Sequence, residues 1–308
     1  MKGPYILLLS AVIGCSDPLK DAQRIEELRV LAARLEVDED ASRAWPSPGD
    51  NVTARFLVAA PQPEPAIGWQ LVACLAAPTT QGIVGCAEPP FARAEAAAVG
   101  PAEPTLSFAV PTELLAGQRP RLAVLGAICE GRVSELGSEL SQANCAGGAP
   151  ILVTFDTPIV VDDNEINHHP TLADALVEID GAAWLAPADA AASCAATAPS
   201  AELPQFTARS GDHRIVIALS GDDRDPLVDS TGLLPPFENL QLSHFSTAGL
   251  LERPFSVIDG GAQRLDVQVT WTAPNSAPEG GLLTRFYFVV RDLRGGVDWI
   301  VRQACIVR

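Results

Sequence analysis

Short apolar runs separated by proline and glycine turns are the feature that most restricts how this chain can fold. The 308 residues include 26 prolines and 24 glycines, and these fall mainly between the runs. The clearest run, 264–272, places Leu265, Val267, Val269 and Trp271 on one face and polar residues on the other. Strict alternation of this kind predicts a half-buried antiparallel strand. The sequence therefore predicts an all-β protein with no helical domain.

Further strands are expected wherever β-branched and apolar residues lie between turn residues. In the first half they are 51–60, 67–75, 104–110, 121–130 and 150–156, and in the second half 213–219, 255–258, 264–272, 282–292 and 297–307. The last two strands flank the sequence Leu293-Arg294-Gly295-Gly296, whose glycines suit the turn of a hairpin.

Residues 25–37 fit two descriptions. Ile25, Leu28, Leu31 and Leu35 recur at helical spacing, but the same segment also suits a strand that is buried on both faces. We favour the strand, because a proline-rich turn at 45–50 leads directly into the next strand.

A domain boundary is expected where strand signals give way to a polar segment. Thr157-Pro158 is followed by an acidic run from Asp162 to Glu165 and then by Asn167-His168-His169-Pro170, which is typical of a linker. This divides the chain into domains at 25–157 and 158–308. In the number and spacing of strands, both halves resemble immunoglobulin-like or fibronectin-like β-sandwich domains. The resemblance implies a fold and no particular activity.

The N-terminal segment has a pattern that is typical of a targeting signal. Its apolar stretch, 5–13, lies behind Lys2 and is far shorter than the roughly 20 residues that span a bilayer. It ends in Val12-Ile13-Gly14-Cys15, which resembles the cleavage and lipidation site of a bacterial lipoprotein precursor.

That resemblance implies removal of the signal peptide 1–14, acylation of Cys15, a tether at 15–24 and anchoring through the acyl chains. Ser16 after the cysteine implies the outer membrane, while the side of the envelope that the body faces stays open. The alternative is a freely secreted protein, since Val12 and Gly14 also suit an ordinary signal peptidase.

Besides Cys15, six cysteines remain, and an even number can pair completely in an oxidising compartment. Local order favours Cys74–Cys86 and Cys129–Cys145, each closing a short loop, which leaves Cys194 and Cys305 as a long-range pair. Six cysteines allow 15 pairings, so this connectivity is one of several.

The formal net charge of −17 excludes nucleic acid as a partner, because affinity for phosphate backbones comes from lysine and arginine. The same charge would keep the body away from anionic lipid head groups. Membrane contact is thus expected only through the acyl chains on Cys15.

Two clusters have the composition of metal sites. His168 and His169 lie near Asp162, Asp163 and Glu165, and the segment Gly221–Pro226 contains three aspartates around Arg224. Adjacent residues on an extended segment point apart, and the second cluster lacks the complete calcium-loop pattern. We expect a solvated loop and an acidic turn, with no metal and no cofactor.

No nucleophile elbow or metalloprotease motif occurs, and His213 is expected to be a strand-edge residue rather than a base. Trp45 and Trp184 are the two tryptophans not assigned to a buried face, which makes them candidates for ligand contact. The sequence thus favours a non-enzymatic, lipid-anchored envelope protein with a structural or binding role and an envelope protein or glycan as partner. A surface adhesion module for glycans or proteins is the main alternative, and a hydrolase with an unrecognised site is the third.

Overall fold

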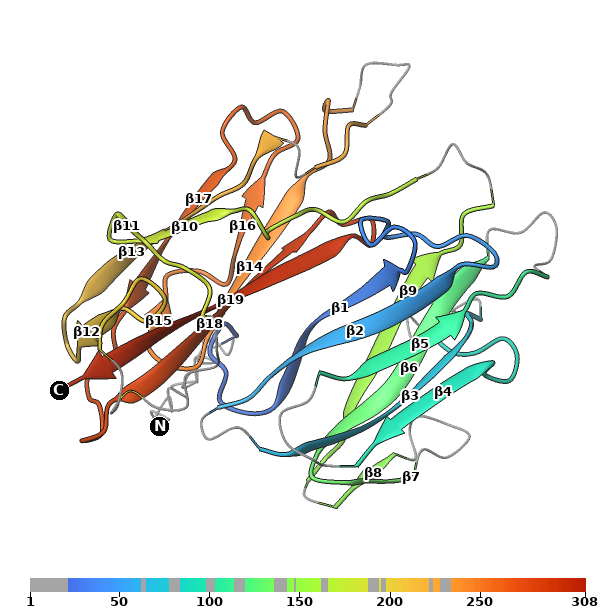
Figure 1. The fold of residues 1–308 in the computed structure, drawn as a ribbon, viewed down its shortest axis with the longest axis horizontal. Coiled ribbons are helices and arrows are strands. Elements are labelled where there is room, and N and C mark those ends of the chain that lie inside the picture. Colours follow the sequence, from blue (N-terminus) through green and yellow to red (C-terminus); the bar gives the residue numbers. More distant parts are fainter. Residues whose placement is uncertain are drawn as a thin grey trace, which may run out of the picture.

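The computed structural model describes residues 22–61, 65–77, 84–97, 103–113, 120–135, 143–146, 148–161, 166–187, 194, 198–221, 224–227 and 234–308. These residues form strands and loops, with no α-helix among them. Figure 1 shows two groups of sheets side by side, the strands β1–β9 in blue to green and the strands β10–β19 in yellow to red. The expectation of an all-β protein is confirmed.

The first group contains a three-stranded and a four-stranded sheet. The order β1-β2-β5 joins β1 (Arg29–Val37), β2 (Asn51–Ala59) and β5 (Thr105–Ala109). The order β4-β3-β6-β9 joins β4 (Ala92–Ala96), β3 (Ile67–Leu75), β6 (Arg121–Glu130) and β9 (Ile151–Pro158), and β7 (Val133–Glu135) pairs with β8 (Asn144–Cys145). Inward residues of both larger sheets, among them Phe56, Leu71 and Ile128, form one core.

The second group contains two five-stranded sheets. The order β11-β10-β13-β17-β15 joins β11 (Ala182–Ala183), β10 (Leu176–Ile179), β13 (Asp212–Ala218), β17 (Asp266–Thr272) and β15 (Leu250–Leu251). The order β12-β19-β18-β14-β16 joins β12 (Gln205–Thr207), β19 (Val297–Val307), β18 (Leu282–Arg291), β14 (Leu240–Ser246) and β16 (Phe255–Ile258). Their facing sides enclose a second core that includes Trp184, Trp271 and Phe286.

The two groups repeat one topology. In the first, β1-β2-β5 faces β4-β3-β6-β9. In the second, with the short strands β11, β12 and β15 set aside, β10-β13-β17 faces β16-β14-β18-β19. Numbered by chain order within each group, with β7 and β8 of the first group also left out, both read 1-2-5 against 4-3-6-7.

A β-bulge in β1 explains the ambiguous pattern at 25–37. The register with β2 shifts between Val30 and Ala32, so two consecutive residues, Leu31 and Ala32, lie on the outer face. Leu28 before the bulge and Leu35 after it both point into the first core. The bulge thus changes the phase of the alternation and imitates helical spacing in what is, as favoured, a strand buried on both faces.

The outer faces of the two groups pack against each other. Leu31, Ala32 and Leu57 from β1 and β2 meet Tyr287 and Val289 from β18 in a separate buried cluster. Gln23, in the segment expected to form the tether, is packed against the second group: its amide donates to the Leu251 carbonyl at 2.7 Å and the residue is 4% exposed. Gln23 therefore contributes a buried hydrogen bond between the N-terminal segment and the second group.

Three disulfides link the cysteines in the pairs that local order favoured. Cys74–Cys86 and Cys129–Cys145 close loops of 12 and 16 residues, and Cys194–Cys305 spans 111 residues. The long-range bond attaches Cys194 to the last strand, β19.

Candidate functional site

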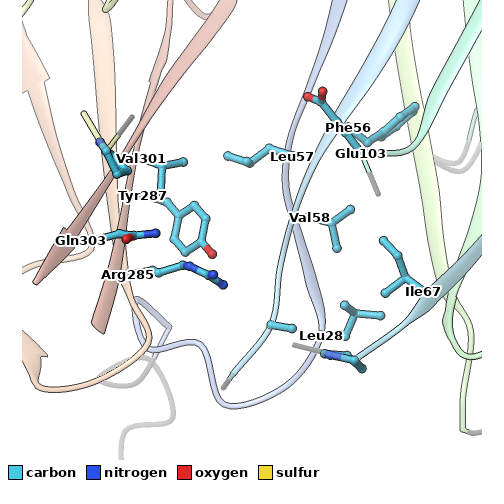
Figure 2. Close-up of a pocket in the computed structure, with 13 residues that line it drawn as sticks. Leu28, Phe56, Leu57, Val58, Ile67, Glu103, Arg285, Tyr287, Val301 and Gln303 are labelled. Carbon is cyan, nitrogen blue, oxygen red and sulfur yellow. The ribbon is translucent and has the colours of Figure 1, made fainter. Parts of the chain in front are cut away.

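The candidate site is a cleft of about 490 Å³ where the two groups of sheets diverge at one end of their contact. Figure 2 shows Leu57 of β2 opposite Tyr287 and Val301 of β18 and β19, with Val58 and Ile67 on the far side of β2. Its lining is mostly apolar and comprises Leu28, Phe56, Leu57, Val58, Ala60, Pro65, Ile67, Glu103, Pro187, Arg285, Tyr287, Val301 and Gln303. A volume in this range accommodates a small organic ligand.

Alternation along the strands explains which side of its sheet each wall residue points to. In β2, Phe56 points into the first core while its neighbour Leu57 points outward against the second group. In β18, Arg285 and Tyr287 share the outward face because they are two residues apart. The cleft therefore reaches three residues of the first core, Leu28, Phe56 and Ile67.

The polar groups of the cleft lie mainly on its second wall. Arg285, Tyr287 and Gln303 contribute a guanidinium, a phenol and an amide, and Glu103 stands on the opposite wall. Burial raises the pKa of Tyr287 above its usual value of 10.0, so the hydroxyl stays protonated at neutral pH and can donate a hydrogen bond. The cleft combines apolar walls with one guanidinium, two neutral hydrogen-bonding groups and the Glu103 carboxylate, which is paired with Arg55 at 3.2 Å.

A joint of hydrogen bonds, made by residues outside the cleft lining, connects the two groups of sheets. Asp298 of β19 accepts from the Arg34 guanidinium of β1 and from the Leu172 backbone N–H, both at 2.7 Å. Asp292 accepts three backbone N–H groups of the 294–296 turn, and its other oxygen accepts from the Asn167 amide at 2.7 Å. These bonds connect the first group, the linker and the last hairpin.

Trp45 belongs to this joint. Its indole N–H donates to the Arg294 carbonyl at 3.0 Å, and the Arg294 guanidinium lies 5.2 Å from the ring. Trp184 lies in the second core, 1% exposed, and its N–H donates to the Gln303 carbonyl at 2.9 Å. Trp184 therefore offers no surface to a ligand, since the ring edge packs on Phe286, and Trp45 offers a partly covered one.

The two adjacent histidines point apart, as expected. His168 Nδ1 lies 3.0 Å from an Asp225 carboxylate oxygen. His169 is buried, and its Nδ1 accepts from the Val297 N–H at 3.0 Å while Nε2 lies 2.7 Å from the Leu35 carbonyl. Burial lowers the pKa of His169 to about 4, which agrees with a neutral ring that uses both nitrogens.

No group of three metal-ligating side chains occurs among the residues that the structure describes. Asp162, Asp163, Glu165, Asp222 and Asp223 lie outside the described residues, as does Cys15. The Arg224 guanidinium donates to the Asp259 and Ala262 carbonyls of the loop between β16 and β17, and it lies 4.4 Å from the Phe237 ring.

A hydrogen-bonded chain of three side chains was not foreseen from the sequence. His213 is buried at the start of β13, with Ser210 Oγ 2.7 Å from its Nε2 and Asp180 Oδ2 2.7 Å from its Nδ1. The one local signal is a serine three residues before a histidine, while Asp180 lies 33 residues from His213 and carries no signal of its own.

Comparisons with known proteins do not assign this chain to a family. No protein-family model matches the sequence, and no curated protein matches it either. Among solved structures, the crystal structure of the CupB6 tip adhesin from Pseudomonas aeruginosa aligns with 90% of this chain and 98% of its own, at 8% identity and a TM-score of 0.18. A TM-score this low is no basis for an argument about fold or function. In the part of the chain that the structure describes, no helix has the length and apolar character to cross a membrane.

Proposed function

We propose that this chain is a lipid-anchored cell-envelope protein that binds a small amphipathic ligand in the cleft between its two groups of sheets. The cleft is the observation that carries the binding role. Its size suits a ligand with an apolar body, and Arg285 favours a negatively charged group at one end. Catalysis is not needed for this role.

We further propose that each group of sheets is an immunoglobulin-like or fibronectin-like sandwich domain, with the boundary near Pro158. The shared topology supports this proposal. Labelled A to G in chain order, the first group reads A-B-E against a sheet in which C, F and G are neighbours, and the fourth strand pairs with C. The immunoglobulin constant-type fold has the same C-F-G sheet and differs in pairing its fourth strand with E.

The lipid anchor rests on the sequence that ends in Cys15 and on the disulfides, which belong to an oxidising compartment such as the periplasm or the cell surface. Replacement of Cys15 by Ser should move the protein from the membrane fraction to the soluble fraction, while Ser16→Ala should remain with membranes. Equal sedimentation of Cys15→Ser and wild type would contradict the anchor.

The cleft can be tested with 1-anilinonaphthalene-8-sulfonate, which has an apolar body and one negative charge. The probe should bind the purified protein with a rise in fluorescence, and Val58→Trp should weaken binding by about tenfold, because the larger side chain takes up part of the cleft. Val257→Trp is the matched control, because Val257 is 60% exposed on β16, outside the cleft. Equal binding to both variants and to wild type would show that the probe binds elsewhere.

A further inference from the structure

We propose that Ser210, His213 and Asp180 form a Ser-His-Asp acyl-transfer site that hydrolyses carboxylic esters. This inference goes beyond the binding role of the cleft. The two distances of 2.7 Å, from Ser210 Oγ to His213 Nε2 and from His213 Nδ1 to Asp180 Oδ2, lie within hydrogen-bonding reach for a nucleophile, its base and the group that orients the base.

The hydrogen bonds assign each proton. An ionised carboxylate can only accept, so the proton of neutral His213 lies on Nδ1 and is donated to Asp180. Nε2 then carries the free lone pair, and the Ser210 hydroxyl donates to it. This is the tautomer in which the imidazole can take the proton of an attacking serine.

The surrounding fold holds the three side chains in place. Asp180 occupies the tight turn between β10 and β11 at a φ of +52°, a left-handed conformation that aspartate tolerates better than most residues. Its second oxygen accepts from the Arg214 N–H at 2.9 Å. The His213 ring packs 4.3 Å from the Phe206 ring and 5.5 Å from Trp271, which fixes its plane.

Ser210 lies at the surface on a turn whose backbone is constrained on both sides. Arg209 before it has a φ of +65° and Gly211 after it a φ of +93°, and the Ser210 N–H donates to the Thr207 carbonyl at 2.9 Å. Two of the three described non-glycine residues with positive φ, Asp180 and Arg209, therefore lie in or beside this cluster. Asp180-Gly181 is an ordinary two-residue hairpin turn, so Arg209 is the strained position, and strain of this kind concentrates at functional sites. An exposed serine fits an ester presented by a larger molecule, with the partly buried Phe206 as an apolar contact.

The reaction balances with water as the only co-reactant. Ser210 Oγ attacks the ester carbonyl carbon as His213 Nε2 takes the hydroxyl proton, and collapse of the tetrahedral intermediate breaks the carbon–alkoxy bond. The leaving alkoxide takes that proton and departs as an alcohol. Water then attacks the Ser210 ester with His213 again as base, and the carboxylic acid is released while the proton returns to Ser210.

A fluorescent fluorophosphonate tests the site on the purified full chain, because its phosphorus takes the place of the ester carbon and fluoride leaves. We expect one adduct, on Ser210, located by peptide mass spectrometry and absent from Ser210→Ala. Ser276→Ala is the matched control: Ser276 is exposed, and its neighbour Asn275 accepts from Arg209 beside Ser210. This control should label like wild type.

Asp180→Asn separates catalysis from a structural role. The asparagine oxygen can still accept from the Arg214 N–H, but the amide N–H₂ would then face His213 Nδ1 and impose the other tautomer. Labelling should slow on the order of 10⁴-fold with an unchanged melting temperature, and His213→Gln should slow it by about 10²–10⁴-fold. The proposal is overturned if Ser210 is not labelled above Ser276, or if Asp180→Asn stays folded and labels at the wild-type rate.

Discussion

Glu238 is the clearest source of pH-dependent stability. Its side chain is 2% exposed, and one oxygen accepts from the Asp225 N–H at 3.0 Å while the other lies 3.6 Å from the Arg294 guanidinium. Burial is the main cause that raises the pKa of Glu238 from 4.5 to about 7. The nearby Asp292 and Asp225 carboxylates act in the same direction, and the hydrogen bond from Asp225 and the Arg294 charge act against it.

The sign and size of the effect follow from linkage. Between pH 4.5 and 7 the folded protein holds this proton more tightly than the unfolded chain, so stability falls as pH rises through that window. Since each pKa unit corresponds to about 1.4 kcal/mol, ionised Glu238 destabilises the fold by up to about 3 kcal/mol above pH 7. Glu238→Gln removes this penalty and keeps an oxygen that accepts from Asp225.

Urea unfolding at pH 4.5 and pH 8, with the disulfides intact and tryptophan fluorescence as the signal, measures the difference. We expect Glu238→Gln to match wild type at pH 4.5 and to exceed it at pH 8 by about 2–3 kcal/mol. Glu279→Gln, at an exposed position, should change neither value. Buried histidines titrate in both wild type and variant, so their contribution cancels. An equal difference at the two pH values would refute the reasoning.

Three further outcomes are expected. Burial lowers the pKa of His169 and His244 to about 4, whereas the histidines of the unfolded chain have a pKa of 6.5. The unfolded chain therefore takes up protons first as pH falls, and the free energy of unfolding should decrease from pH 6.5 toward 4. His169→Gln should make this decrease smaller in the same unfolding assay. Replacement of Cys194 and Cys305 by Ala should lower the free energy of unfolding by about 5 kcal/mol, because this disulfide closes a loop of 111 residues. Replacement of Cys74 and Cys86 by Ala should lower it by about 3 kcal/mol, because that loop has 12 residues. Equal losses of stability in thermal melting would contradict the entropic account. Asp298→Ala removes two bonds of the joint and should weaken binding of the anilinonaphthalene probe, as fluorescence titration would show.

The strands with clear alternation could be predicted because alternation is a local property. The hairpin of β18 and β19 and the strand β17 lie where the pattern placed them. The central strand β14 was missed because its sequence, Leu240–Ser246, buries Ser243, His244 and Ser246. A strand that buries polar residues on both faces gives no hydrophobic period.

The cleft could not be predicted in the same way, because its walls come from residues more than 200 positions apart in the sequence, such as Leu57 and Tyr287. One signal was present. The run Phe286–Val290 is apolar at every position, and a strand with this composition is covered on both faces. In β18 the inward face packs in the second core, and the outward face meets the first group.

The cleft and the serine site depend on different parts of the molecule. The cleft exists only while β1 and β2 are held against β18 and β19, so every bond of the joint, such as Arg34 to Asp298, contributes to its shape. Ser210, His213 and Asp180 all belong to the second group, within or beside β10 and β13. A change that loosens the joint should therefore impair probe binding and leave phosphonate labelling intact, whereas Asp180→Asn should do the reverse. Loss of both properties in either variant would mean that the two groups do not fold as separable units.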